Sequence, residues 1–192
     1  MGALDDAPAI ETDDRATWRA WLEANHAIAG GAWLVTWRSR SGRVGLDYEA
    51  AIEEALCFGW VDSTAGRVDD ERGKLYFAPR KPRSPWAATN KARVERLMGD
   101  GRMAPAGLAA MERAKANGSW EVLDTVERLE VPADLAAALE AHPGAAANFS
   151  AFSRSARKMQ LGWVALALRP ETRAARIAKV AEAAGRNERA RG

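Results

Sequence analysis

A helix that ends at a glycine and runs directly into a strand constrains this chain most. Asp47 is a suitable N-cap for a helix over residues 48–58, and Gly59 supplies the left-handed position at which many helices end. Alternating β-forming residues predict strands on both sides of this helix. The predicted strands cover residues 32–37, 60–68 and 74–78. The order strand, helix, strand, strand indicates a small sheet with helices packed against it.

Prolines and glycines divide the rest of the chain into helices. Asp13 or Asp14 can cap a first helix, which Gly30 and Gly31 end. Four later helices start at prolines, whose missing N–H suits the first helical turn. Helices are expected at residues 85–98, 105–117, 132–141, 145–168 (with a break near Gly162) and 170–184. The predicted fold class is α+β, with a small three-stranded sheet and two helices in the N-terminal half and an all-helical C-terminal half.

The same signals predict the domain organisation. Residues 1–12 are expected to form a flexible tail and residues 13–101 an α/β N-terminal part. Residues 102–185 are expected to form a helical C-terminal part that packs on it as one unit. The basic end at residues 186–192 is expected to fray. With 47% hydrophobic and 28% charged residues, the chain can bury a core.

Composition excludes several kinds of site. Cys57 is the only cysteine, and His26 and His142 are the only histidines, so an intramolecular disulfide and a multi-cysteine metal cluster cannot form. We expect no metal and no cofactor. A membrane span needs about 18 consecutive apolar residues, and none is predicted. The acidic N-terminus shows no secretory signal, which predicts a cytoplasmic location.

Charges alternate along the chain in blocks. Residues 1–71 carry 14 acidic and six basic side chains, whereas residues 72–102 carry two and nine, and residues 154–192 carry three and ten. These blocks can neutralise one another across the fold, or they can line a positive groove for an anionic partner. The net charge is only +2 and no base-reading motif occurs, which argues against nucleic acid.

The strongest case for binding lies where the third strand ends and the next helix begins. Ser84 as N-cap and Pro85 at the first helical position predict a helix start whose free N–H groups would face Arg80 and Arg83. A phosphate, sulfate or carboxylate suits such a place. The alternative is a solvated basic loop.

Two tryptophans, a carboxylate and an amide would complete this site. Trp60 and Asp62 lie two residues apart on a strand and therefore point to the same face. Trp86 and Asn90, one turn apart on the following helix, would add a stacking surface and an amide. Core packing of the rings and a salt bridge from Asp62 to Arg80 are the structural alternatives.

Cys57 and Asp62 are the weak candidates for catalysis. Cys57 lies in the last turn of its helix, where the negative end of the macrodipole raises a thiol pKa. A small buried apolar cysteine is therefore the expected state. An enzyme that uses Asp62 with Cys57 on a small molecule is an alternative.

Several stretches of the chain form a distinctive set. They are Glu54-Ala-Leu-Cys-Phe-Gly-Trp-Val-Asp62, Phe77-Ala-Pro-Arg80, Ser84-x-Trp86, Asn90-x-x-Arg93-Val-Glu-x-Leu97, Gly101-Arg-Met-x-Pro-Ala-Gly107 and Glu171-Thr-Arg-Ala-Ala-Arg-Ile177. On these motifs the chain, over roughly residues 17–184, resembles the YdeI/OmpD-associated (OmdA-like, bacteriocin-protection) family of small bacterial proteins. A familiar form of that family has a serine where this chain has Ala87. The resemblance implies protection against bacteriocins or cationic antimicrobial peptides and a link to the cell envelope, without assigned catalytic residues.

We therefore expect a cytoplasmic stress- or resistance-associated protein that binds a small anionic or aromatic ligand in a Trp/Arg-lined pocket. The expected ligand-binding residues are Trp60, Asp62, Arg80, Arg83, Ser84, Trp86 and Asn90. The alternatives are the enzyme named above, and a non-specific nucleic-acid-binding or helical protein-interaction module. The sequence leaves the oligomeric state open.

Overall fold

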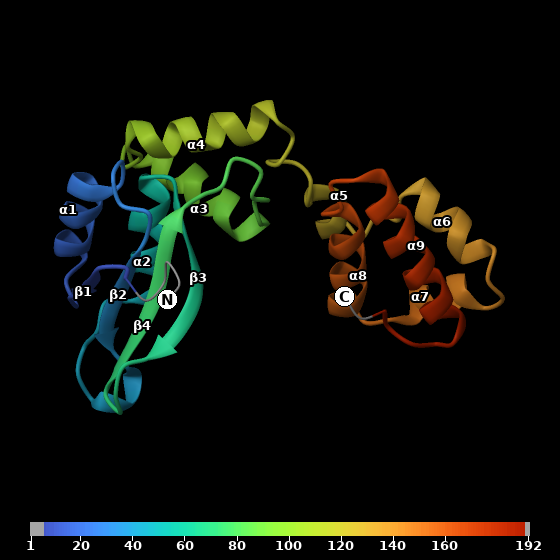
Figure 1. Ribbon diagram of the computed structural model, residues 1–192, viewed down its shortest axis with the longest axis horizontal. Coiled ribbons are helices and arrows are strands. Elements are labelled where there is room, and N and C mark those ends of the chain that lie inside the picture. Colours follow the sequence, from blue (N-terminus) through green and yellow to red (C-terminus); the bar gives the residue numbers. More distant parts are fainter. Residues whose placement is uncertain (1–5, 191–192) are drawn as a thin grey trace. The chain divides into compact units, whose positions relative to one another are not determined.

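The structure is a computed structural model that describes residues 6–190 (Figure 1). Contacts within the chain define two compact units. The first contains the chain up to Ser84 together with Thr89–Asn117, and the second contains Pro85–Ala88 and the chain from Gly118 onwards. The prediction that both parts fold as one cooperative unit stays a prediction.

One mixed sheet forms the centre of the first unit (Figure 1). Its strands are β1 (Ala9–Glu11), β2 (Ala32–Trp37), β3 (Trp60–Arg67) and β4 (Arg72–Pro79). The spatial order is β1-β2-β4-β3, with β1 parallel to β2 and the other neighbours antiparallel. Since β2 and β3 both run antiparallel to β4, they are parallel to each other with β4 inserted between them.

The predicted three-stranded sheet is wrong, because β1 adds a fourth strand. A three-residue strand is too short to show alternation in the sequence, and it forms here by pairing with the edge of β2. The N–H of Trp33 donates to the carbonyl of Pro8 across 2.8 Å, and that of Thr12 donates to the carbonyl of Val35 across 3.1 Å. This strand lies inside the predicted tail at residues 1–12, of which residues 1–5 are outside the described part.

The prediction of two helices is also wrong, because four α-helices contribute to the first unit. They are α1 (Arg15–Asn25), α2 (Tyr48–Cys57), α3 (Ala88–Gly99) and α4 (Pro105–Ala116), with a short 3-10 helix η1 (Ser39–Ser41) after β2. The predicted caps of the first two are confirmed: Asp14 accepts from the N–H of Thr17, and Asp47 accepts from the N–H of Ala50.

Gly59 and Gly107 let α4 approach the end of α2. Gly59 has a φ of 74°, as its position after α2 predicts, and a Cβ there would lie 2.9 Å from Cβ of Ala110. A Cβ on Gly107 would clash with the carbonyl of Cys57. The N–H of Ala104 donates to that same carbonyl across 3.0 Å, which joins the start of α4 to α2.

Helices α1 and α2 cover one face of the sheet through aromatic side chains. Trp18 is fully buried, donates from Nε1 to the carbonyl of Ala51 across 3.1 Å, and packs 5.2 Å from the ring of Phe77 on β4. Trp21 stacks on Trp18 at 5.5 Å and meets Trp60 edge to face at 5.9 Å. These rings belong to the core of the first unit, together with aliphatic residues such as Leu22 and Leu56.

The predicted helix start at Ser84 and Pro85 is wrong, since α3 begins at Ala88. The N–H of Ser84 donates to the carbonyl of Lys81 across 2.9 Å, which closes a turn instead of a helix. Trp86 then donates its N–H to the carbonyl of Ser119 in the second unit across 3.3 Å. Residues 84–87 are therefore not helical, and the N–H groups of Ser84 and Trp86 bond to carbonyls outside α3.

The second unit is helical. It contains α5 (Asp124–Glu127), α6 (Ala133–Glu140), α7 (Ala145–Ala151), α8 (Arg154–Ala165) and α9 (Pro170–Gly185) around one apolar core. The predicted break near Gly162 is wrong: the chain breaks at Phe152, and Ser153 caps α8 by accepting from the N–H of Ala156.

The frayed end predicted at 186–192 stays a prediction, and residues 186–190 of it are described. Ala190 is buried, and its carbonyl accepts from Nε2 of Gln160 across 2.9 Å. Residues 191–192 lie outside the described part. Among residues 6–190, no helix is long and apolar enough to cross a membrane.

Candidate functional site

The structure does not gather all the predicted ligand residues. Trp60 is 1% exposed, lies edge-on to Trp21, and donates from Nε1 to the carbonyl of His26 across 3.3 Å. Trp86 belongs to the second unit, where it is buried 5.0 Å from the ring of Trp120. Both rings therefore belong to a core, which is the alternative to ligand binding that the sequence analysis gave for them.

The helix start predicted at Ser84 is not formed, and the anion site expected beside it stays a prediction. Ser84 closes a turn, and the helix that it was expected to cap begins four residues later, at Ala88. Arg83 is exposed, which matches the solvated-loop alternative. Ser84 therefore does not cap a helix beside Arg80 and Arg83.

Cys57 is a free, fully buried cysteine. Burial raises the pKa of its thiol, and a neighbouring hydrogen bond from Arg19 only partly opposes that effect. The thiol is therefore protonated near neutral pH, which does not favour a nucleophile.

Asp62 has a hydrogen-bond partner that the sequence did not suggest. The hydroxyl of Tyr48, at the first position of α2, donates to Oδ2 of Asp62 across 3.1 Å. Burial and the charge of Asp62 raise the pKa of Tyr48, so its hydroxyl keeps its proton. Arg80 is buried, which lowers its pKa to about 10 while the charge of Asp62 opposes the shift.

Asn90 joins the same cluster through Arg93. Nη1 of Arg93 donates to Oδ1 of Asn90 across 2.7 Å, while Nε and Nη2 make a two-pronged contact with Glu49 at 2.8 and 2.6 Å. The hydrogen bonds to Glu49 raise the pKa of Arg93, with weaker contributions from the charges of Tyr48 and Asp62. Three predicted residues thus share one electrostatic cluster with Tyr48, Glu49 and Arg93, which the sequence reasoning missed.

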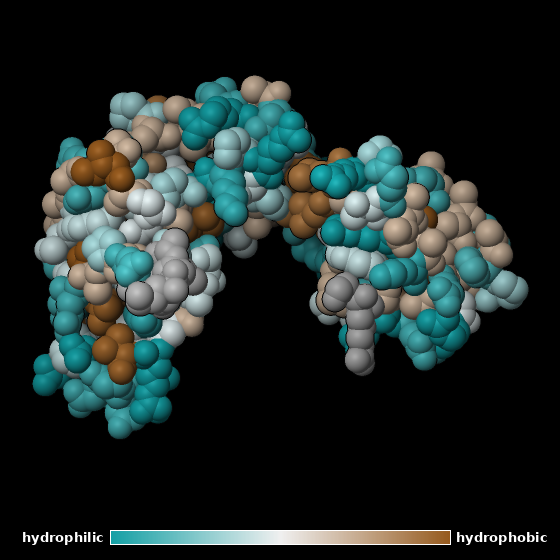
Figure 2. Space-filling view, viewed as in Figure 1, coloured by the Kyte–Doolittle hydropathy of each residue, from teal (hydrophilic) through white to brown (hydrophobic). Residues whose placement is uncertain are grey.

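A groove of about 790 Å³ opens beside Tyr48 in the first unit. Its apolar lining comes from β2, β4, the loop before α2, and α2 itself: Leu34, Leu46, Ala51 and Leu75. Polar and aromatic residues complete it: Trp37, Arg38, Arg40, Arg43, Asp47 and Tyr48. In Figure 2, hydrophilic surface covers the end of the sheet near η1 and the β3–β4 turn, with hydrophobic atoms beside it.

The arginines at this end of the groove differ in their pairing. The guanidinium of Arg43 lies 4.3 Å from the ring centroid of Trp37. Arg40 donates from Nε to the carbonyl of Asp70 across 2.9 Å. Within residues 6–190, no carboxylate forms an ion pair with Arg38 or Arg43. Two cations are therefore left to meet an anion. Lys74, which also lines the groove, instead places its ammonium 4.2 Å from the ring of Trp33.

A second cluster that sequence reasoning missed surrounds the buried carboxylates of Glu53 and Glu54 on α2. Their partners are Arg15 and Arg19 of α1, Arg96 of α3, and Arg102. Arg15 reaches both carboxylates, at 2.6 Å from Glu53 and 2.5 Å from Glu54. Two adjacent glutamates within the apolar run from Ala50 to Cys57 of α2 were the available signal. Their partners, 35 to 48 residues away, could not be read from that signal.

These ion pairs join an acidic block of the sequence to the basic block that follows it. Besides Arg96 and Arg102, Arg72 pairs with Glu11 at 2.5 Å and with Asp69 at 2.7 Å, and Arg93 pairs with Glu49. Much of the positive charge between residues 72 and 102 is thus neutralised inside the first unit. A basic surface for nucleic acid is correspondingly reduced.

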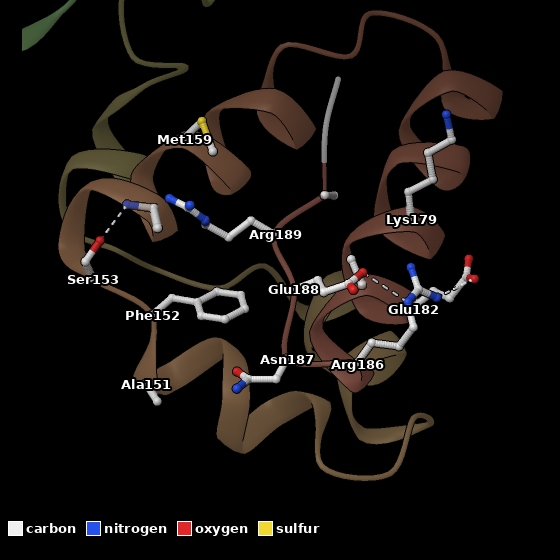
Figure 3. A pocket seen from close by; sticks show the side chains of 13 residues that line it. Ala151, Phe152, Ser153, Met159, Lys179, Glu182, Arg186, Asn187, Glu188 and Arg189 are labelled. Atoms are coloured by element: carbon white, nitrogen blue, oxygen red, sulfur yellow. Dashed lines mark hydrogen bonds and ion pairs between the residues drawn. The ribbon is translucent and has the colours of Figure 1, made fainter.

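The second unit has a larger cavity, of about 1220 Å³, between α7, α8, α9 and residues 186–190 (Figure 3). Figure 3 shows Arg186 between Glu182 and Glu188, which it contacts at 2.8 and 3.2 Å. Arg189, Met159 and Ser153 also line this cavity. None of the residues predicted to bind ligand lines this cavity, and the charge of Arg186 is already paired.

Two family models match the chain. One, described as a domain of unknown function (DUF8412), matches residues 10–110, and the other, described as bacteriocin-protection, YdeI or OmpD-associated (OmdA), matches residues 128–187. The second confirms the suspected resemblance over the region that holds the motif at 171–177, while the motifs between 54 and 107 fall in the first match. No curated protein and no solved structure matches the chain. The first model covers more than half of the chain, which therefore belongs to the DUF8412 family and carries a YdeI/OmpD-associated region at residues 128–187.

Proposed function

We propose that the first unit is a binding module for a small amphipathic anion, held in the groove between the sheet, η1 and the start of α2. The observation that carries this proposal is an apolar floor, with Leu34 and Leu75, next to Arg38 and Arg43, which have no carboxylate partner in the described chain. The sequence also predicted an anionic ligand. We propose that this ligand binds in the groove and not beside Arg80 and Trp86.

The floor and the cations have different roles in this proposal. Burying about 200 Å² of apolar ligand surface contributes about 5 kcal/mol. Association and ordering cost a comparable amount, so charge and geometry decide the affinity. Arg43 is partly ordered by its contact with Trp37, which reduces the cost of fixing its guanidinium on a carboxylate or phosphate.

Titration calorimetry with octanoate tests the proposal. We expect saturable binding that Arg43→Gln weakens about tenfold, because the anion loses its fixed donor. Arg189→Gln is the matched control, since Arg189 is an exposed arginine of the cavity in the second unit. Octanoate binding that depends on Arg189 and not on Arg43 would move the site to the other unit. No binding to the wild-type chain would end the proposal.

The wider role in resistance rests on the YdeI/OmpD-associated region. We propose that ligand capture by the first unit serves a protective or stress-related role, in line with the words of that family's description. A strain without the chain should gain bacteriocin tolerance from the wild-type protein and less from Arg43→Gln. Equal rescue by both proteins would separate protection from the groove. The predicted cytoplasmic location stays a prediction, which cell fractionation tests.

A further inference from the structure

We infer that the groove selects a phosphate monoester over a singly charged anion, with the phosphate on the arginines of the β2–α2 connection and the ester group on the apolar floor. This inference rests on the proposed function and specifies the chemical class of its ligand. The observation behind it is the excess of basic over acidic side chains in the lining of the groove.

Basic side chains dominate the charge of this lining. Among the described residues that line the groove, one carboxylate, Asp47, stands against four basic side chains: Arg38, Arg40, Arg43 and Lys74. Asp47 is already in use, because its Oδ2 accepts from the N–H of Ala50 at the start of α2 across 3.1 Å. A ligand with a single negative charge therefore leaves positive charge in the groove uncompensated.

Two of these arginines are placed at the end of β2. A Cβ added to Gly73 would lie 3.4 Å from Cγ of Arg38, so the stem of Arg38 runs beside the sheet at this glycine. Gly73 pairs with Thr36, and the guanidinium of Arg43 lies 4.3 Å from the ring centroid of the next residue, Trp37. One doubly charged group at this end of the groove can therefore meet two guanidinium groups.

The other two cations of the lining keep their charge. Arg40 donates to a neutral carbonyl, that of Asp70, and the carboxylate of Asp70 lies 4.0 Å from Arg40 and is contacted more closely by Arg67. The ammonium of Lys74 lies over the neutral ring of Trp33. Both cations add to the positive potential of the groove, and a dianion gains more from that potential than a monoanion does.

A phosphate monoester suits this arrangement better than two separate carboxylates. Its second proton leaves at a pKa of about 6, so at neutral pH close to two negative charges share the oxygens of one group. Guanidinium groups bind such oxygens two at a time. Three of the four cations come from residues 38–43, which favours both charges on one group, and the floor with Leu34 and Leu75 suits the hydrocarbon or aromatic part of the ester.

The test compares octyl phosphate with octyl sulfate by titration calorimetry on the full chain, at about pH 8 and about pH 5. The two probes share their chain and a tetrahedral head group, but the sulfate carries one charge at both pH values. We expect octyl phosphate to bind about tenfold more tightly at the higher pH. The ratio should fall toward one at the lower pH, where most of the phosphate is a monoanion.

The pH arm of this test reports on the ligand. None of the described residues that line the groove is a histidine. The ordinary pKa values of their ionisable side chains, which are aspartate, tyrosine, lysine and arginine, lie outside the interval between the two measurements. Burial and the charge of Asp62 raise the pKa of Tyr48 further above it.

Variants assign the preference to the arginines. We expect Arg38→Gln and Arg43→Gln each to lower the affinity ratio at the higher pH, because the second charge loses a partner. Arg189→Gln, the control in the second unit, should keep the wild-type ratio. Thermal melts of each variant establish that it is folded.

Two sources could supply the phosphate monoester, a free small molecule or the head group of phosphatidate in a membrane. Co-sedimentation with phosphatidylcholine vesicles, with and without phosphatidate, distinguishes them. Sedimentation that needs phosphatidate and that Arg43→Gln reduces supports the inference with a lipid as the source. A preference for octyl phosphate without sedimentation supports it with a free ligand as the source.

The remaining outcomes overturn the inference. If octyl sulfate binds as tightly as octyl phosphate at the higher pH, or if folded Arg38→Gln and Arg43→Gln both keep the wild-type ratio, the inference is overturned while the groove remains an anion site. If octanoate, octyl sulfate and octyl phosphate all fail to bind, the proposed function and the inference fall together.

Discussion

Nη1 of Arg19 lies 2.7 Å from Oε2 of Glu54, and this contact ties α1 to a carboxylate that is only 1% exposed. Arg15 and Arg102 contact the other oxygen of the same carboxylate. A charge this deeply buried depends on its partners, because breaking such a cluster leaves uncompensated charge inside the protein.

Removing Glu54 should therefore destabilise the chain. We expect Glu54→Ala to lower the free energy of unfolding by about 3 kcal/mol, because the arginines lose a shared partner. Glu95→Ala, an exposed glutamate on α3, should change it by less than about 0.5 kcal/mol. Urea unfolding followed by tryptophan fluorescence measures both. If both variants lose the same free energy of unfolding, the ion-pair cluster does not stabilise the fold more than an exposed glutamate does.

Glu53 should make the free energy of unfolding depend on pH in the acidic range. Burial alone would raise its pKa, but hydrogen bonds from Arg15 and Arg96 prevail and lower the pKa below the ordinary value. Such a carboxylate contributes stability that is fully present above its unfolded pKa, about 4.3, and is lost as the pH falls through the lower folded pKa. Unfolding free energies measured from neutral pH into this acidic range should fall less steeply in Glu53→Gln than in the wild type. Parallel curves would contradict the prediction.

Substitutions of two tryptophans should affect different properties, stability for Trp60 and octanoate binding for Trp37. Trp60 is core, so Trp60→Ala should cost about 3 to 5 kcal/mol of stability, whereas Trp60→Phe should fold and leave octanoate affinity intact. Trp37 is half-buried beside Arg43, so Trp37→Ala should cost less stability and weaken octanoate binding severalfold. Chemical denaturation and calorimetry on the same samples give both readouts. Weakened binding in Trp60→Phe would restore Trp60 to the ligand site.

Gly107 should tolerate no side chain. Its added Cβ would clash with the carbonyl of Cys57, so Gly107→Ala should force α4 away from α2 and cost about 1 to 3 kcal/mol. Gly99, in the last turn of α3, has nothing within 4 Å of an added Cβ. Gly99→Ala should be neutral or slightly stabilising. A thermal melt that ranks the two variants in the reverse order would refute the close approach.

Local signals in the sequence predicted several elements well. Asp47 and Gly59 bracket α2 because a side-chain cap and a left-handed glycine act on their own neighbours. Residues 32–37 coincide with β2 for a similar reason, since alternation is a property of the strand itself. The burial of Cys57 also agrees with the position of that residue in its helix.

The candidate site depends on hydrogen bonds between residues that are distant in the sequence, which local sequence patterns do not predict. Ser84 is a suitable N-cap and Pro85 suits the first helical position, yet the carbonyls of Lys81 and Ser119 take the N–H groups of Ser84 and Trp86, and the helix begins later. Asp62 was singled out, but its partner, Tyr48, lies 14 residues earlier.

The sequence by itself determined where most helices and strands begin and end, and it determined that no disulfide joins two parts of the chain. It also carried the motif at 171–177 within the YdeI/OmpD-associated region. The tertiary structure alone decided that β1 joins the sheet, that Glu53 and Glu54 meet four arginines, and that Tyr48 turns its hydrogen toward Asp62. Periodicity and capping are short-range effects, whereas pairing and burial of charges depend on which distant segments the folded chain brings into contact.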